Sequence, residues 1–177
     1  MFLKGEKKLL SVTSCDSGKG FDPLLTKEGV KEAQRMLHKL VNRSGNRDLS
    51  DIVIASGKGR RHLQTVKILF GRKPEITDRR LGIAETSYGD HLIISEGKKI
   101  SLKKAVQLQS FRKFCEEIVP FLKFLLLKEM ERKKTLVAVG TCMPVTAAGI
   151  PYKEVQSASI YELGMTDELK LWAKKVF

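Results

Sequence analysis

Three short and nearly continuous apolar runs constrain the fold of this 177-residue chain more than any other feature. They are KLLSVTS at residues 8–14, DIVIAS at residues 51–56 and TLVAVG at residues 135–140. Runs this short and this apolar are typical of parallel strands buried on both faces of a sheet. Each is followed by a loop of small and polar residues and then by a helical pattern. The alternation predicts a mostly parallel sheet with helices on both faces.

Apolar residues at helical spacing mark the helices between these strands. Thr26 is the expected N-cap of a helix that ends near residue 41, and a second helix is expected at residues 60–70. A third helical stretch, residues 101–133, should break near Ser110 and be kinked or restart at Pro120, because proline lacks the amide hydrogen that a helix interior needs. The remaining expected elements are a strand at 75–78, an irregular stretch at 81–100, a short helix at 145–149, a strand at 157–163 and a terminal helix at 167–175.

The charge balance favours anionic partners. The chain has 33 Lys and Arg against 20 Asp and Glu, a net charge of +13. Such a field attracts nucleic acid, phosphorylated metabolites, acidic proteins and anionic membranes, although a solvated basic surface explains it equally well. No RRM, KH or zinc-finger pattern supports nucleic-acid binding, and aromatic residues are only 7% of the chain.

Cysteine usage and the amino-terminal sequence predict a cytoplasmic protein that does not enter a membrane. The three cysteines are Cys15, Cys115 and Cys142, an odd number without the spacing of a disulfide framework. The first ten residues carry lysines and lead into no apolar signal region. The most apolar run, residues 118–127, is too short to span a bilayer. Cys15 and Cys142 lack a third and fourth ligand, so no metal and no cofactor is expected.

Four segments, in order, resemble motifs of the histidine phosphatase (phosphoglycerate mutase-like) superfamily. They are LLSVTSCDS with the helix opening LTKEGVKEA, SGKGRRHLQTVKIL, IAETSYG, and TLVAVGTCMP. The resemblance implies one domain over residues 1–177, folded as a three-layer α/β/α sandwich. It also implies that residues 13–15 and 141–142 follow neighbouring strands.

The same resemblance exposes a loss of catalytic groups. Where the family has Arg-His-Gly, this chain has Thr13, Ser14 and Cys15. Where the family has its second His-Gly, the chain has Thr141 and Cys142. The first family histidine accepts the phosphoryl group, and the second stabilises charge on it. The resemblance therefore implies a catalytically degenerate member, a pseudoenzyme.

Part of the family's phosphate pocket is retained. Arg61 lies four residues before Thr65, as the family's helix-start arginine does, but one extra loop residue leaves Arg60 as an alternative. Glu85 falls where the mutase-type acid protonates the leaving group. His62 is expected to face solvent, and no histidine is placed to act as a base. The expected ligand-binding set is Thr13, Ser14, Cys15, Arg60, Arg61, Thr141 and Cys142, and Ser14, Thr141 and Glu85 occupy the former catalytic positions.

Other phosphate chemistries find little support. A cysteine phosphatase needs arginine six residues after its cysteine, and Phe21, Phe121 and Ala148 occupy those positions. The tetrapeptide Ser-Gly-Lys-Gly occurs twice, at residues 17–20 and 56–59, but neither copy matches the nucleotide-binding P-loop. The leading hypothesis is a phosphorylated or anionic ligand bound without turnover. Two alternatives stay open: a non-enzymatic basic module for nucleic acid or an acidic protein, and an active phosphatase with unorthodox groups.

Overall fold

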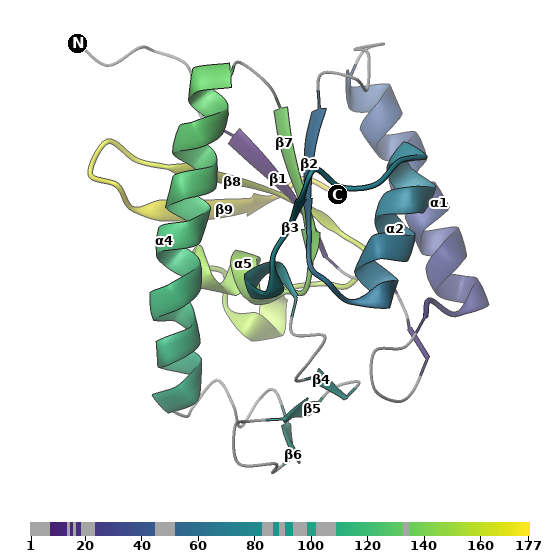
Figure 1. Cartoon of the computed structure of the whole chain (residues 1–177), viewed down its shortest axis with the longest axis horizontal. Helices are drawn as coiled ribbons and strands as arrows, with labels where there is room; N and C mark the ends of the chain where they lie inside the picture. Colours follow the sequence, from purple (N-terminus) through teal and green to yellow (C-terminus); the bar gives the residue numbers. More distant parts are fainter. Residues whose placement is uncertain are drawn as a thin grey trace.

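The computed structural model describes residues 8–13, 15, 17–18, 24–44, 52–82, 87–88, 91–93, 99–101, 109–132 and 135–177. A six-stranded sheet forms the central layer, with helices α1 and α2 on one face and α4 and α5 on the other (Figure 1). The predicted three-layer α/β/α sandwich with a mostly parallel sheet is confirmed.

The sheet has the strand order β3-β2-β7-β1-β8-β9. Its centre consists of β1 (Lys8–Thr13), β7 (Thr135–Gly140) and β2 (Ile52–Ser56), which are parallel to one another and coincide with the three apolar runs. The short β3 (Ile76–Thr77) is parallel to β2 at one edge. At the other edge, β8 (Ile160–Met165) is antiparallel to β1.

The two helices on one face of the sheet form where the apolar spacing predicts them. Helix α1 covers Lys27–Ser44, and the hydroxyl of its N-cap residue Thr26 accepts a hydrogen bond from the Gly29 amide at 3.1 Å. Helix α2 covers Arg60–Phe70 and ends at Gly71, whose positive φ of 66° favours glycine. Both helices pack on the central strands through a shared core. That core contains Val12, Ala33, Met36, Leu40, Ile54, Val66, Leu69, Val137 and Val139.

The long helix on the opposite face differs from its prediction. Helix α4 covers Gln109–Arg132 and continues through Pro120, so the expected restart is absent. Pro120 is exposed, and the positions on either side of it bury an apolar face that holds the helix against the sheet. The buried members of that face are Ile118, Phe121, Leu122, Leu125 and Leu126. The short helix α5 (Met143–Ala147) begins two residues before its predicted start, with proline in its first turn.

The carboxyl-terminal prediction of a helix is wrong. Residues Leu171–Lys175 form strand β9, which pairs antiparallel with β8. The connecting turn is closed by a 2.8 Å hydrogen bond from the Thr166 amide to the Lys170 carbonyl, and Leu169 adopts a positive φ of 61°. Gly164 of β8 lies directly beneath the indole of Trp172, where a β-carbon has no room. Pairing with β8 therefore makes this segment a strand.

Smaller elements complete the chain. A separate antiparallel sheet of β4 (Ser87–Tyr88), β5 (His91–Ile93) and β6 (Lys99–Ser101) lies within the stretch predicted to be irregular. Strand β8 begins at residue 160 rather than 157, after a short 3-10 turn, η3 (Tyr152–Glu154). Within the described ranges, no helix combines the length and the apolar character needed to cross a membrane.

Candidate functional site

Three parallel strands end side by side at one edge of the sheet. Thr13 at the end of β1 is paired with Gly140 of β7, and Ser56 at the end of β2 is paired with Val139 of β7. The chain leaving β2 stays close to β7, because the Gly57 amide donates to the Val139 carbonyl at 2.9 Å. Residues 13–15 and 141–142 therefore follow neighbouring strands, as the sequence comparison requires. Ligand sites in open α/β sheets lie at this carboxyl edge.

The start of α2 brings a buried arginine to this edge. Arg61 has only 8% of its surface exposed, whereas the neighbouring Arg60 is exposed. The Nη1 atom of Arg61 donates to Ser17 Oγ at 3.3 Å. The Thr65 hydroxyl, one turn along α2, donates to the Arg61 carbonyl at 2.8 Å. Of the two arginines left open by the sequence, Arg61 is the one buried at the strand ends.

The loop between β1 and α1 is fastened to α2 by side chains that the sequence did not single out. Ser17 forms an isolated β-bridge with Leu25, and the Gly18 amide donates to the Leu24 carbonyl at 3.0 Å. The Leu25 amide donates to the Gln64 side chain of α2 at 2.9 Å. Together with the Arg61 contact to Ser17, these bonds hold the loop over the beginning of α2.

The Thr13 side chain is buried and forms hydrogen bonds with backbone groups of another segment. Its hydroxyl donates to the Gln156 carbonyl at 2.8 Å and accepts from the Ser159 amide at 3.0 Å. Only 2% of the residue is exposed. These bonds join the end of β1 to the segment that enters β8, so the hydroxyl stabilises the fold.

Thr141 and Cys142 follow β7 and open α5. The Thr141 hydroxyl accepts from the Met143 amide at 3.3 Å, and its own amide donates to the Leu81 carbonyl at 2.9 Å. Burial raises the pKa of the Cys142 thiol to about 11, although the positive charge of Arg61 partly opposes that rise. Cys142 is consequently a protonated thiol near neutral pH, which is a poor nucleophile.

Neither cysteine at the strand ends forms a disulfide or a metal site in the described structure. Neither Cys15 nor Cys142 is in a disulfide, and Cys15 is 4% exposed within the apolar core between the sheet and α1. Among the described residues, no cluster of three or more His, Cys, Asp and Glu side chains could hold a metal ion.

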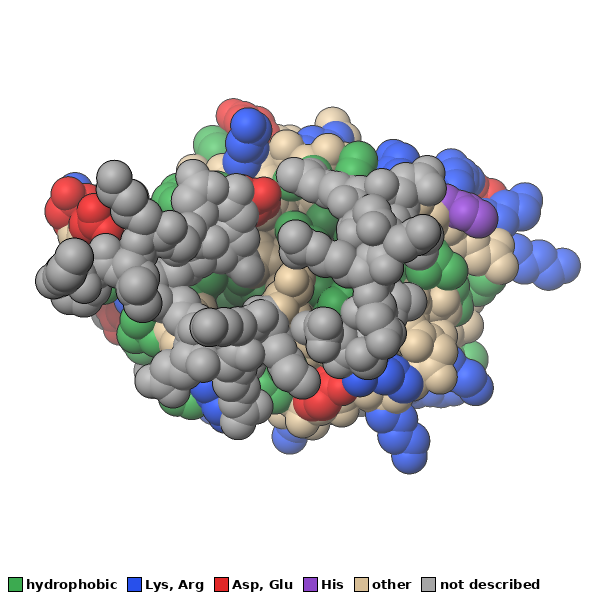
Figure 2. Space-filling model, turned by 90° about the horizontal axis from the view of Figure 1, so that it is seen from above, with side chains coloured by type: hydrophobic (Ala, Val, Ile, Leu, Met, Phe, Trp, Pro, Cys, Tyr) green, Lys and Arg blue, Asp and Glu red, His purple; other side chains and the backbone are tan. Residues whose placement is uncertain are grey.

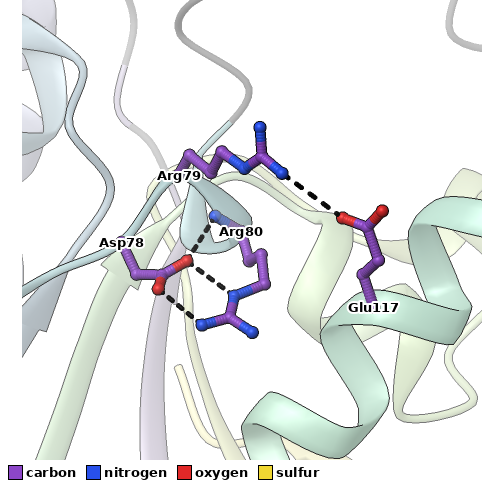
Figure 3. Close-up of polar contacts among 4 residues, drawn as sticks. All are labelled: Asp78, Arg79, Arg80 and Glu117. Atoms are coloured by element: carbon purple, nitrogen blue, oxygen red, sulfur yellow. Dashed lines mark hydrogen bonds and ion pairs between the residues drawn. The ribbon is translucent and has the colours of Figure 1, made fainter.

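A tight side-chain cluster fixes the loop that follows β3 (Figure 3). Asp78 accepts from the Arg80 amide at 2.8 Å and from the Arg80 guanidinium at 2.8 and 2.7 Å. The same guanidinium lies 3.9 Å from the centre of the Phe121 ring on α4. Arg79 adds a looser ion pair with Glu117 of α4 at 3.9 Å. Hydrogen bonding to Arg80 lowers the pKa of Asp78, so this cluster stays ionised near neutral pH.

This cluster holds the 3-10 turn η2 (Arg79–Leu81) against the end of β7. The Leu81 carbonyl accepts from the Thr141 amide at 2.9 Å. It also passes so close to Gly140 that a β-carbon there would overlap the carbonyl group. Glycine at position 140 is therefore required by close backbone approach, which the sequence alone does not indicate.

His62 lies inside the protein, so the prediction of a solvent-facing side chain is wrong. It is 0% exposed, and neither ring nitrogen has a hydrogen-bond partner in the described structure. A β-carbon built on Gly82 would lie 2.7 Å from His62 Nε2, and one on Gly57 would lie 3.0 Å from His62 Cδ2. Burial and the neighbouring charge of Arg61 lower the pKa of His62 to about 3. The two glycines that make room for the ring are the only sequence signal of this arrangement.

The other two histidines belong to other elements. His38 is exposed on α1 and His91 belongs to β5, so none of the chain's three histidines follows β1 or β7. Two sequence-predicted positions, Ser14 and Glu85, fall outside the described residues.

Comparison with known proteins places the fold. No family model matches the sequence, and no curated protein matches it. A phosphoserine phosphatase mutant from Entamoeba histolytica, in complex with phosphoserine, matches in structure with a TM-score of 0.63. That match has 15% identity and covers 96% of this chain and 95% of the other. The chain has the phosphoglycerate mutase-like fold.

Further solved structures agree over nearly the whole chain. A mycobacterial glucosyl-3-phosphoglycerate phosphatase gives a TM-score of 0.61 at 14% identity, covering 97% of each chain. The Entamoeba histolytica phosphoserine phosphatase in complex with 3-phosphoglyceric acid gives 0.60 at 15% identity, covering 96% of each chain. Identities this low establish a shared fold and leave activity to be argued from the residues.

Proposed function

We propose that this chain is a histidine phosphatase-like protein that binds a phosphorylated or other anionic ligand beside Arg61 without transferring the phosphoryl group. The supporting observation is a buried guanidinium at the meeting point of three parallel strand ends. Arginine stays ionised in proteins, and its planar fork matches the oxygens of a phosphate or carboxylate.

The electrostatics of the described residues favour an anion at this edge. Burial raises the pKa of Cys142 and lowers that of His62, and the charge of Arg61 partly opposes the rise and adds to the fall, so its positive potential reaches both residues. His62 is neutral near pH 7, and the Cys142 thiol is neutral as well. Neither of these two groups therefore adds a negative charge beside Arg61.

The same residues argue against covalent phosphoryl transfer. A transfer through an enzyme intermediate needs a nucleophile that is activated by a base or by a lowered pKa. The Thr13 hydroxyl is committed to two backbone groups, and the Cys142 thiol has a raised pKa. No imidazole follows β1 or β7. A chain lacking the family's nucleophile should lose most of the covalent rate enhancement.

Calorimetric titration with phosphoserine as the probe tests the binding claim. Arg61→Gln should weaken binding at least tenfold, or about 1.4 kcal/mol, because the charged donor is lost. Arg60→Gln removes the same charge from an exposed neighbouring position and is the matched control, which should bind within twofold of the unsubstituted protein. Equal losses in both variants, or no effect of Arg61→Gln, would contradict a pocket at Arg61.

Turnover of a phosphomonoester tests the claim that catalysis is absent. Incubation with p-nitrophenyl phosphate should release no more nitrophenol than a buffer control, and mass spectrometry should find no phosphoenzyme. Turnover that disappears in Ser14→Ala or Cys15→Ala would instead establish an active phosphatase with unorthodox groups.

A further inference from the structure

We propose that the solvent face of α1 and α2 binds the phosphate backbone of a nucleic-acid duplex, independently of base sequence and of the Arg61 pocket. This basic face comprises the exposed Lys and Arg of α1, of α2 and of the loop before α2. They are Lys27, Lys31, Arg35, Lys39, Lys58, Arg60 and Lys67.

A row of basic residues runs along α1. Lys27, Lys31, Arg35 and Lys39 recur at every fourth position, and all four are exposed. The side chains of Lys31 and Arg35 are 67% and 64% exposed. Steps of four residues advance about 6 Å along a helix and turn about 40° about its axis, so the row winds about a third of the way around α1. The row therefore presents a series of exposed positive charges that follows the length of α1.

Helix α2 widens this row into a face. The two helices pack side by side on the same face of the sheet (Figure 1). Lys58, Arg60 and Lys67 are exposed, and α2 contains no acidic residue. The acidic residues of α1 are Glu28 and Glu32. Glu28 pairs with Lys31 at 3.6 Å and with Arg35, but these pairs are exposed and such pairs contribute little.

Among the described side chains, the largest excess of positive charge lies on this side. The basic face carries seven Lys and Arg against two Glu, a net charge of +5. On the opposite helical layer, the described α4 side chains balance Lys123 and Lys128 against Glu116 and Glu117. The β8–β9 hairpin, residues 160–175, is also balanced, with three Lys against three acids. Figure 2 shows Lys and Arg gathered on the right, the α1 and α2 side in Figure 1.

The composition of the basic face favours a duplex over other polyanions. Single-strand binders stack bases on aromatic rings, and in the described parts of α1 and α2 the one Phe, Tyr or Trp side chain is Phe70, which is only partly exposed. Amphipathic helices that bind membranes insert an apolar face, but the apolar faces of α1 and α2 are packed in the core. A regular row of cations against a regular row of phosphates remains as the matching chemistry.

Fluorescence polarisation with a labelled 20-base-pair duplex tests the proposal between 50 and 200 mM KCl. Unsubstituted protein should bind, and the slope of log affinity against log salt should be steep. The triple variant Lys27→Gln, Lys31→Gln, Arg35→Gln should bind at least tenfold more weakly at 50 mM KCl. Its slope should be shallower by about 2 to 3, since each phosphate contact contributes about 0.9.

A charge-matched variant distinguishes binding by the basic face from binding that depends only on the net charge of the protein. Lys153→Gln, Lys170→Gln and Lys174→Gln remove three exposed lysines elsewhere. This control should bind the duplex within twofold of the unsubstituted protein, with both triples melting within a few degrees of it. Equal weakening by both triples would overturn the proposal, as would absence of duplex binding at 50 µM protein in 50 mM KCl. Tighter binding to poly-glutamate or to phosphatidylserine vesicles would also overturn it, in favour of a protein or membrane partner.

The Arg61→Gln variant distinguishes this proposal from the pocket. That variant should bind the duplex as the unsubstituted protein does, because Arg61 is buried and is not part of the basic face. Loss of duplex binding in Arg61→Gln would assign the nucleic acid to the pocket and would overturn a separate face.

Discussion

The segments that end β1 and β7 and the segment that opens α2 meet at the same edge of the sheet, but their polar groups are used differently. At the strand ends, the hydroxyls of Thr13 and Thr141 are bound to backbone groups, and the Cys142 thiol is neutral. At the start of α2, Arg61 keeps its charge while buried. In the function proposed above, the charge of Arg61 holds the anion, and the described groups at the strand ends do not act as nucleophiles.

The largest expected effect tests whether η2 holds the end of β7 in place. Gly140→Ala places a methyl group against the Leu81 carbonyl, where both partners are backbone and cannot move aside easily. We expect a loss of at least about 3 kcal/mol in the free energy of unfolding, measured with urea. Gly71→Ala is the control. A β-carbon at Gly71 meets no neighbouring atom, so only its positive φ disfavours alanine, and we expect a loss of about 1–2 kcal/mol in the free energy of unfolding. Equal losses would contradict the close approach of η2 to β7.

The next effect concerns His62, which lies beside Arg61 and should make the fold sensitive to acid. Its pKa is about 3 in the folded protein, whereas a histidine exposed to water has a pKa of about 6.5. Between these values the unfolded chain binds more protons, so protonation favours unfolding as pH falls. Stability should therefore decline by about 1.4 kcal/mol per pH unit below pH 6.5, or about 2 to 3 kcal/mol by pH 4.5.

His62→Leu removes the titrating group and should flatten this decline, as measured by urea unfolding at pH 4.5, 5.5 and 6.5. His38→Gln removes an exposed histidine from α1 and should leave the decline unchanged. A decline of equal slope in His62→Leu would show that other groups govern the acid sensitivity.

A smaller effect sharpens the structural role of Thr13. Thr13→Val keeps the side-chain shape and removes the hydroxyl, which leaves the Ser159 amide and the Gln156 carbonyl without this partner. We expect a loss of about 1–3 kcal/mol in unfolding free energy, with phosphoserine affinity unchanged. Lost affinity at unchanged stability would instead place Thr13 in the ligand site.

The last prediction concerns the alkylation rate of the Cys142 thiol and how the charge of Arg61 changes that rate. With a pKa of about 11, Cys142 should be alkylated by iodoacetamide at pH 8 roughly a hundredfold more slowly than a free cysteine peptide. Peptide mapping by mass spectrometry separates it from the other two cysteines. Arg61→Gln should slow the reaction further, because the arginine charge favours the thiolate. Faster alkylation in Arg61→Gln would show that the arginine acts as a steric shield.

Local sequence pattern determined the parts of this protein whose burial follows directly from it. The three apolar runs became the central strands, because residues buried on both faces must be apolar throughout. Apolar periodicity fixed α2 at residues 60–70, and Thr26 marked the start of α1 through its side-chain cap. The order of strand-end motifs was also sufficient to predict the phosphoglycerate mutase-like fold.

Tertiary contacts decided the remaining features, because the alternative conformations or burial states of these residues differ only in their contacts with distant parts of the chain. Residues 171–175 carry a pattern that suits a helix, and pairing with β8 makes them a strand. The sequence left Arg60 open as an alternative to Arg61, and packing buries Arg61 and exposes Arg60. His62 is buried because Gly57 and Gly82, from two separate loops, leave room for its ring. The Thr13 hydroxyl bonds to a residue 146 positions away, a distance that no local pattern encodes.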